Sequence, residues 1–113
     1  MTLPNRLHQN SLRQEDGRRS PAHRAWVRGH ACCVPGCEDR PIECVHVRTG
    51  TDGGLGVKPS DIWTVSLCRD HHSEQHRIGE ASFERAHGID LKRLASEFTA
   101  RSPHRSKMEA RNA

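Results

Sequence analysis

The sequence predicts a small single-domain α+β fold that a bound metal ion stabilises. The chain has 113 residues, of which only 33% are hydrophobic, with two Phe, two Trp and no Tyr. Such a chain buries a modest core and usually needs disulfides, a structural metal or oligomerisation as well. Five Cys and nine His favour the metal, because an odd number of Cys in a reducing compartment argues against a disulfide framework.

Nothing in the sequence predicts contact with a membrane. No apolar run approaches the roughly 20 residues needed to span a bilayer. The N-terminus lacks the apolar segment of a signal peptide, since Pro4, Asn5 and Arg6 follow almost at once. We therefore expect a cytoplasmic protein with no membrane partner, whose oligomeric state the sequence does not predict.

The chain has a net charge of +4, and its basic excess lies at the two ends, in residues 1–20 and 101–113. The first segment carries four Arg against two acidic residues, and the second carries four basic residues against one. We expect both to be disordered basic tails around a domain at 21–100. They could hold phosphate backbones without sequence preference, or only keep a small protein soluble.

The domain is expected to begin with a helix and a cysteine-bearing turn. Ser20 is a suitable N-cap, and Pro21 a suitable first residue, for a helix that stops at Gly29. Residues 31–41 then form a knuckle, in which a Pro-Gly pair forces a tight turn between cysteines.

Two short strands follow, at 42–47 and 62–67, where apolar positions recur at strand spacing. Residues 49–58 contain four Gly and are expected to form a loop. The two strands and this loop together predict an antiparallel hairpin with a long connection.

Three helices are expected after the second strand, at 69–78, at 81–86 and from Asp90 onward. Gly79 and Gly88 end the first two, and Asp90 caps the third. The apolar face of the third helix consists of Leu91, Leu94, Ala95 and Phe98.

Two pairs of metal-ligating residues flank the predicted hairpin. Cys32-x4-Cys37 precedes the first strand, and Cys68-x2-His71 stands where the second strand becomes a helix. A hairpin brings these two turns together, as a closed tetrahedral zinc site requires. Cys33 could replace Cys32, but the longer x4 loop leaves more room for the turn. The alternative is that these cysteines are small buried side chains that bind nothing.

The same helix carries a second candidate site. His72 and His76 stand at i and i+4 on one face, so they could hold a divalent cation with open coordination positions. His71 is rotated by about 100° from His72, so the two neighbours can serve different metals. The alternative is that these are ordinary solvent-exposed histidines.

His46 lies on the first predicted strand, between the two zinc half-sites. An antiparallel partner strand that feeds into the helix would carry His46 over the face of His72 and His76. A neutral imidazole at that place could take a proton from water as a general base. A purely structural histidine is the alternative.

Taken together, these motifs resemble the zinc-containing HNH endonucleases, also called His-Me finger or ββα-metal nucleases. The closer similarity is to small phage- and prophage-encoded HNH nucleases of the recombination-enhancement type, and it covers about residues 22–100. The matching stretches are Cys32-x4-Cys37, Val45-His46-Val47-Arg48, Gly53-Gly54-Leu55-Gly56, Lys58-Pro59-Ser60-Asp61 and Leu67-Cys68 through His72.

The resemblance implies a ββα-metal fold that cleaves the phosphodiester bonds of DNA. His46 would be the general base, and His72 and His76 would hold Mg²⁺ or another divalent cation such as Mn²⁺ or Ni²⁺. That ion would stabilise the phosphorane and the leaving 3′ oxygen. Little sequence specificity is expected, because no helix rich in Arg, Asn and Gln is visible. The residues that would hold structural zinc are Cys32, Cys37, Cys68 and His71.

Two positions depart from the family pattern. Val45 stands where many HNH enzymes have a second metal-binding His or Asp, and Trp63 falls near the family Asn. Two His alone hold a hard cation poorly. Asp61 is the nearest replacement, either as a metal ligand or by orienting His46, although it could also only cap the turn into the strand.

Two cationic residues are candidates for binding phosphate, and two functions are alternatives to DNA cleavage. Arg48 and Lys58 could meet the scissile and adjacent phosphates, or be solvated surface charges. One rival is a non-catalytic zinc module that binds DNA or a protein partner on a degenerate HNH scaffold. The other is a phage accessory factor that acts on a host recombinase or nuclease, with the tails as docking arms.

Overall fold

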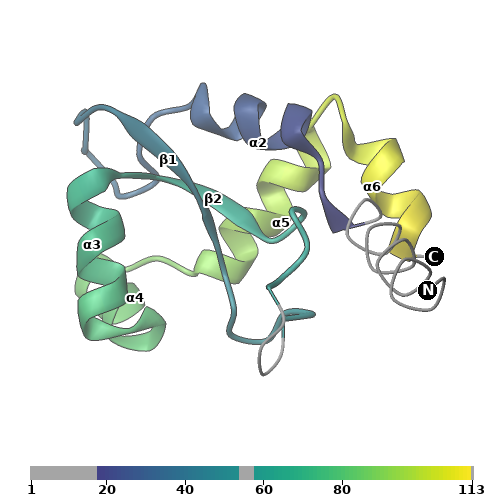
Figure 1. The fold of residues 1–113 in the computed structure, drawn as a ribbon. Coiled ribbons are helices and arrows are strands. Elements are labelled where there is room, and N and C mark those ends of the chain that lie inside the picture. The colour runs from purple at the N-terminus through teal and green to yellow at the C-terminus, as the bar shows by residue number, and fades with distance from the viewer. Residues whose placement is uncertain (1–17, 54–57, 113) are drawn as a thin grey trace, which may run out of the picture.

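The computed structural model describes residues 18–53 and 58–112. Most of the predicted tail 1–20 lies outside these ranges, as do Gly54, Leu55 and Gly56 of the predicted loop. The elements are α2 (Pro21–Arg28), β1 (Ile42–His46), β2 (Thr64–Cys68), α3 (Arg69–Ile78), α4 (Glu80–His87), α5 (Leu91–Arg101) and α6 (Arg105–Asn112) (Figure 1). This order confirms the α+β class. None of these described helices is long and apolar enough to cross a membrane.

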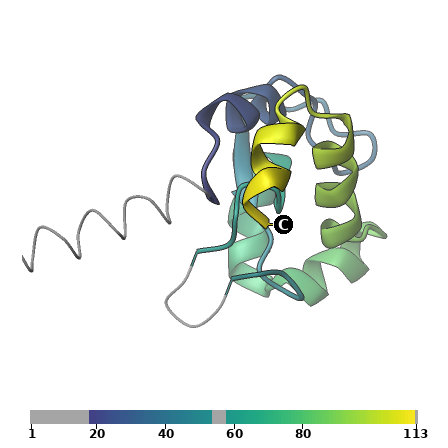
Figure 2. The same ribbon diagram turned by 90° about the vertical axis from the view of Figure 1, so that its right-hand side faces the viewer.

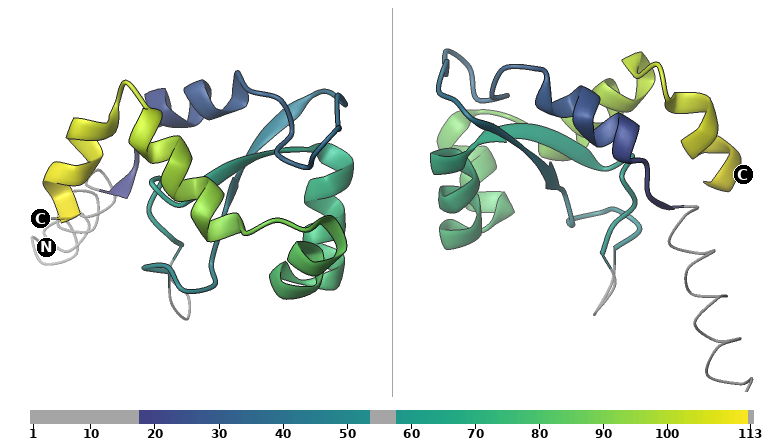
Figure 3. Two further views of the ribbon diagram at one scale, coloured as in Figure 1. Left: turned by 180° about the vertical axis from the view of Figure 1, so that it is seen from behind. Right: turned by 45° about the horizontal axis from the view of Figure 1, so that its top comes forward.

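The sheet has two antiparallel strands, which pair from Ile42 opposite Cys68 to His46 opposite Thr64. α2 and α5 pack against it, and α3 continues directly from β2 and contacts both strands (Figures 1 and 3). The predicted hairpin is therefore confirmed. Its register puts the start of β1 beside the start of α3, so the loop before β1 meets the junction of β2 and α3.

The core gathers around β2, all five residues of which are buried. Large apolar side chains from the helices on either side surround this strand, and each contributes roughly 1.5–3 kcal/mol when it leaves water. The largest fully buried apolar side chains include Phe83, Leu67, Leu91, Val27 and Val65. β1 is more open, since only two of its five residues are buried, and this leaves its polar side chains available to a site.

Side-chain caps begin two helices at the residues that the sequence predicts. Ser20 Oγ accepts a hydrogen bond from His23 N at 3.1 Å, and Asp90 Oδ1 accepts one from Arg93 N at 3.1 Å. Gly88 ends α4 with a φ of +65°, a left-handed conformation that favours Gly. These predicted helix boundaries are therefore confirmed to within a residue or two.

Described structure also lies outside the predicted domain of 21–100. Arg19 and Ser20 contact the carboxylate of Asp61, at 3.3 and 2.7 Å. At the other end, α5 extends into the predicted tail and α6 follows (Figure 2). The physical reason is burial, since Ser102 and Met108 are only 7% and 5% exposed. A single apolar residue in a polar segment forms no periodic pattern, so the sequence does not predict that α6 packs here.

His23 is a fully buried histidine that connects α2 to the end of α5. It is 0% exposed, and its Nδ1 lies 2.8 Å from the Ser102 hydroxyl. Its Nε2 has no hydrogen-bond partner within the part of the chain that the structure describes. Burial lowers the pKa of His23 to about 4, while Asp61 opposes this shift and His104 adds to it. The ring is therefore neutral at pH 7.

We expect the buried neutral His23 to make the fold sensitive to acid. Between its ordinary pKa of 6.5 and its folded pKa of about 4, the unfolded chain binds a proton at this position and the folded chain does not. Stability therefore falls by roughly 3 kcal/mol as the pH drops through this window. His23→Gln keeps a hydrogen-bonding group that does not titrate and should lose correspondingly less between pH 7 and pH 4. Urea unfolding at both pH values measures this, and equal losses in the two proteins would contradict the expectation.

Candidate functional site

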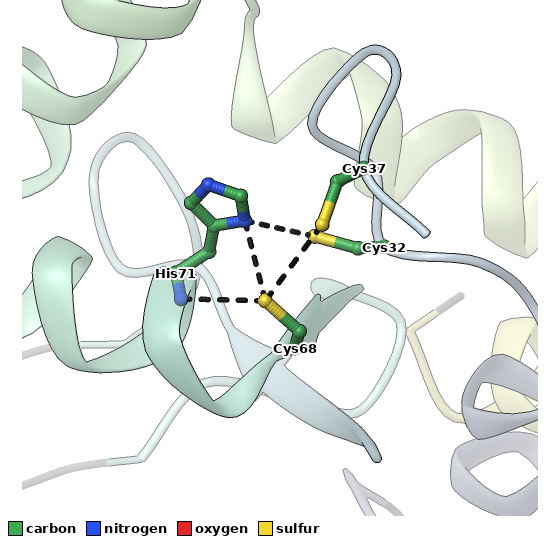
Figure 4. A group of neighbouring side chains, drawn as sticks. All are labelled: Cys32, Cys37, Cys68 and His71. Atoms are coloured by element: carbon green, nitrogen blue, oxygen red, sulfur yellow. Dashed lines mark hydrogen bonds between the residues drawn. The ribbon is translucent and has the colours of Figure 1, made fainter. Parts of the chain in front are cut away.

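Two turns that are far apart in the sequence bring four potential metal ligands together (Figure 4). Cys32 and Cys37 come from the loop between α2 and β1, and Cys68 and His71 come from the junction of β2 and α3. Their ligand atoms all lie within 4.8 Å of one another. This Cys/His cluster could therefore hold a metal ion such as zinc.

Distances within the Cys/His cluster match a tetrahedral zinc site. His71 Nδ1 lies 3.3 Å from the Sγ atoms of both Cys32 and Cys68, and the Sγ atoms of Cys37 and Cys68 are 3.9 Å apart. Around one zinc ion with ordinary bond lengths, a nitrogen and a sulfur lie about 3.6 Å apart and two sulfurs about 3.8 Å apart. The donor set and its spacing therefore fit zinc.

Local backbone geometry explains why the loop cysteines face this point. Gly36 has a φ of +80°, which favours Gly, and a backbone hydrogen bond from Cys37 N closes the turn at 3.1 Å. The bond from Cys33 N to the Ser66 carbonyl, at 2.8 Å, holds this knuckle against β2. Cys33 itself lies outside the cluster, so the preference for Cys32 agrees with the geometry.

Beside the cluster, β1, the loop after it and α3 line a pocket of about 610 Å³. On α3, His71 faces the cysteines and His72 faces the pocket, as a rotation of about 100° per residue requires. The structure thus brings together the side chains predicted for catalysis, cation binding and phosphate binding. Those that line the pocket are His46, Arg48, Lys58, His72 and His76.

A buried carboxylate holds His46 in the pocket wall. The Nε2 atom of His46 lies 2.8 Å from Asp61 Oδ1, and the Asp61 side chain is completely buried. Ser20 N donates to Asp61 Oδ2 at 2.7 Å, and the guanidinium groups of Arg19 and Arg24 lie 3.3 and 3.2 Å away. Of the three alternatives for Asp61, this geometry matches the one in which it orients His46, because hydrogen-bond donors and positive charges surround both carboxylate oxygens.

The partners of Asp61 also keep it ionised. Burial alone would raise its pKa, but hydrogen bonds from His46 and Ser20 N, and the charge of Arg24, outweigh burial and hold the pKa below its ordinary value. An ionised carboxylate only accepts hydrogen bonds, so His46 Nε2 carries the proton that faces Asp61. In the neutral ring, Nδ1 is then the atom that can accept a proton.

His72 and His76 point ring nitrogens at each other. Their Nε2 atoms are 3.0 Å apart, and His72 Nδ1 donates to Glu43 Oε1 at 2.7 Å. Two imidazole nitrogens bound at right angles to one ion would also lie about 3.0 Å apart. The pair could therefore share an ion, although in the described chain no third His, Cys, Asp or Glu joins both of them in a candidate metal group. The sequence does not predict Glu43 as a partner of His72, because Glu43 lies on a strand and no fixed spacing relates it to a residue of a helix.

Acidic side chains hold the loop that carries Arg48 and Lys58. Glu80 accepts hydrogen bonds at 2.8 Å from two successive backbone N–H groups, the first of them that of Arg48. Asp52 accepts one from Ser60 N at 2.9 Å and another from the Ser60 hydroxyl. Both ends of the loop are thereby fixed, and the two cationic residues that it carries line the pocket.

Fold and cluster together define a small α+β protein with a Cys/His cluster that could hold a metal ion such as zinc. Residues 12–102 match the family described as "Protein of unknown function (DUF968)", and the chain belongs to this family. The matched range includes both the cluster and the pocket.

One curated relative is the uncharacterized protein YdfU of Escherichia coli (strain K12), to which the chain is 34% identical over 67 residues. The alignment covers 58% of this chain and 18% of that protein. The chain therefore spans less than a fifth of the length of the curated relative that it matches. No solved structure matches the chain.

We expect the purified protein to bind one zinc ion per chain through the cluster. Cys32→Ser removes one of four ligands that share a binding free energy of roughly 10–16 kcal/mol, and it should weaken zinc binding at least 100-fold. Cys33→Ser is the matched control, because its thiol is next in sequence but outside the cluster. Elemental analysis and competition with a chromophoric chelator measure both variants. Zinc lost from Cys33→Ser and kept by Cys32→Ser would show that the wrong thiol is assigned.

Proposed function

We propose that this protein is a metal-dependent endonuclease of the HNH type, which hydrolyses phosphodiester bonds in DNA. The observation that supports this most is the content of the pocket. It combines an imidazole paired with a buried carboxylate, two facing imidazoles and two cationic residues. A DNA phosphate is a substrate that would use all three. The order of β1, β2 and α3 beside a Cys/His cluster agrees with a ββα-metal fold.

In this proposal His46 is the general base. Because Nε2 donates to Asp61, the other ring nitrogen, Nδ1, takes a proton from a water molecule. The hydroxide attacks the phosphorus, and the bond from phosphorus to the 3′ oxygen breaks on the opposite side. The 3′ oxygen leaves with the bonding electrons and takes a proton from solvent water, so the products are a 5′ phosphate and a 3′ hydroxyl. Asp61 stabilises the imidazolium that forms, since its carboxylate lies 2.8 Å from the ring.

His72 and His76 would hold the catalytic cation at their Nε2 atoms. A divalent cation there supplies charge stabilisation for the phosphorane and for the leaving oxygen. Glu43 accepts the Nδ1 proton of His72 and so leaves Nε2 free as a ligand atom. Imidazole ligands favour Ni²⁺ or Co²⁺ over Mg²⁺ and Mn²⁺, to which oxygen ligands are better suited.

Arg48 and Lys58 would bind the phosphates next to the scissile one, because both belong to the pocket wall. Zinc in the Cys/His cluster would be structural. It would fasten Cys68 and His71 at the start of α3, and so hold His72, the next residue, in position.

A non-catalytic zinc module that binds DNA or a protein partner is the second candidate. The observation in its favour is that, among residues 18–53 and 58–112, no third potential ligand joins both His72 and His76. This function would need the Cys/His cluster but not His46, so the two candidates differ in what they require of the pocket.

We expect the zinc-loaded protein to nick supercoiled plasmid DNA when Mg²⁺, Mn²⁺, Ni²⁺ or Co²⁺ is supplied. His46→Ala removes the general base and should slow nicking by roughly 10²–10⁴-fold. His104→Ala is the matched control, because His104 does not line the pocket, and it should nick at the wild-type rate. Gel quantification of nicked plasmid, with the zinc content of each protein, measures the effect.

Two outcomes of this assay would count against the proposal. Equal nicking by the wild type and His46→Ala would exclude His46 as the base. If no cation supports nicking, although the wild type holds one zinc and binds DNA, the endonuclease proposal fails and the non-catalytic module is favoured.

Asp61→Asn tests the orientation of His46 separately from its presence. An amide both donates and accepts hydrogen bonds, so it no longer keeps the His46 proton on Nε2. We expect nicking to fall at least tenfold while DNA binding is retained. Because Asp61 is buried, zinc content and the thermal midpoint must show that the variant is folded. A folded Asp61→Asn protein that nicks normally would remove Asp61 from the mechanism.

A further inference from the structure

The Cys/His cluster has an outer side, which faces the pair of helices α3 and α4. The Nδ1 atom of His71 lies 3.3 Å from two cysteine sulfurs, and the other ring nitrogen points away from them (Figure 4). His71, Glu74 and His87 form a second group whose potential ligand atoms all lie within 4.8 Å of one another. His71 thus joins the sulfurs to a carboxylate and a second imidazole.

Glu74 is held firmly beside His71. It follows His71 by three residues on α3, so both side chains lie on the same helix face. The carboxylate is hydrogen-bonded to His87 Nε2, from the last residue of α4. The buried ring of Phe83 lies 6.2 Å from the His71 ring and 4.5 Å from the His87 ring, measured between centroids. The three polar groups therefore have little freedom to separate.

A histidine that binds a metal through Nδ1 must carry its proton on Nε2. A carboxylate on that side accepts the proton's hydrogen bond, sets the tautomer and ring orientation, and makes the ligand nitrogen more basic. Loss of such an outer partner typically weakens metal binding by 10–100-fold. Neither Glu74 nor His87 has a role in the proposed chemistry, since both lie outside the pocket.

We propose that Glu74, held by His87, is a positioning residue for the metal ligand His71. When a metal binds at Nδ1, the Nε2–H group donates to the Glu74 carboxylate. The proposal rests on the zinc site inferred above and is independent of endonuclease activity. In this arrangement the last residue of α4 completes the outer side of the cluster.

The test is the zinc affinity of the full chain, measured by competition with a chromophoric chelator. Glu74→Gln should bind zinc 10–100-fold more weakly than the wild type, and His87→Gln should show a smaller loss. Asp70→Asn is the matched control, because Asp70 is an exposed acid on α3 next to His71, and its affinity should be unchanged. Equal affinities of the wild type and Glu74→Gln would overturn the proposal.

A double-mutant cycle distinguishes positioning from general stability. In a His71→Cys background the cluster has four thiolates and no imidazole to orient, so adding Glu74→Gln should not weaken zinc binding further. An equal loss in both backgrounds would mean that Glu74 supports only the fold. If His71→Cys does not fold, the visible spectrum of the cobalt-substituted protein replaces the cycle. The spectrum should change in Glu74→Gln and not in Asp70→Asn, and identical spectra would overturn the proposal.

Zinc stoichiometry separates the remaining outcomes. A wild-type protein that binds no zinc overturns the inferred zinc site, whatever the nicking assay gives. Two zinc ions per chain, one of them lost in His87→Gln, would mean that His71, Glu74 and His87 form a metal site of their own. That result would overturn the positioning role.

Discussion

Cys68 is the residue on which the sheet, the Cys/His cluster and the pocket helix all depend. It ends β2, where it pairs with Ile42. Its sulfur accepts a hydrogen bond from His71 N at the start of α3 and lies 3.3 Å from His71 Nδ1. One side chain therefore links the end of β2, the first turn of α3 and the ligand His71. Each residue of an α-helix is rotated by about 100° from the one before it. The position of His71 at the start of α3 therefore also directs His72 and His76 to the pocket.

Buried charge is the second constraint. Asp61 is completely buried, and a buried carboxylate costs several kcal/mol unless it is paired. Ser20 N and Arg24 lie at one of its oxygens, and Arg19 and His46 lie at the other. The same charge thus holds the segment before α2 to the sheet and orients the imidazole of the pocket. A change in this network would alter stability and the proposed chemistry together.

Much of the fold and half of the site could be predicted from the sequence. The contacts that could not be predicted join side chains from separate elements. Cysteine spacing, the Ser20 cap and the i, i+4 relation of His72 and His76 are local features, so the sequence carries them directly. Glu43 and the pair of Glu74 and His87 could not be predicted as partners of His72 and His71, because they join separate elements. α6 was also missed, since a single buried Met108 leaves no periodic pattern.

The sequence by itself determined the α+β class, the hairpin, the four residues of the Cys/His cluster and the helix face that carries His72 and His76. The two ligand pairs and the helix face follow from spacing within one turn or helix, and the hairpin, which brings the pairs together, follows from two strand patterns on either side of a Gly-rich loop. Only the tertiary structure decided that Asp61 contacts His46, and that Glu43 accepts a hydrogen bond from His72. Those contacts depend on how β1, the loop before β2 and the residues before α2 pack against one another, which no local pattern encodes.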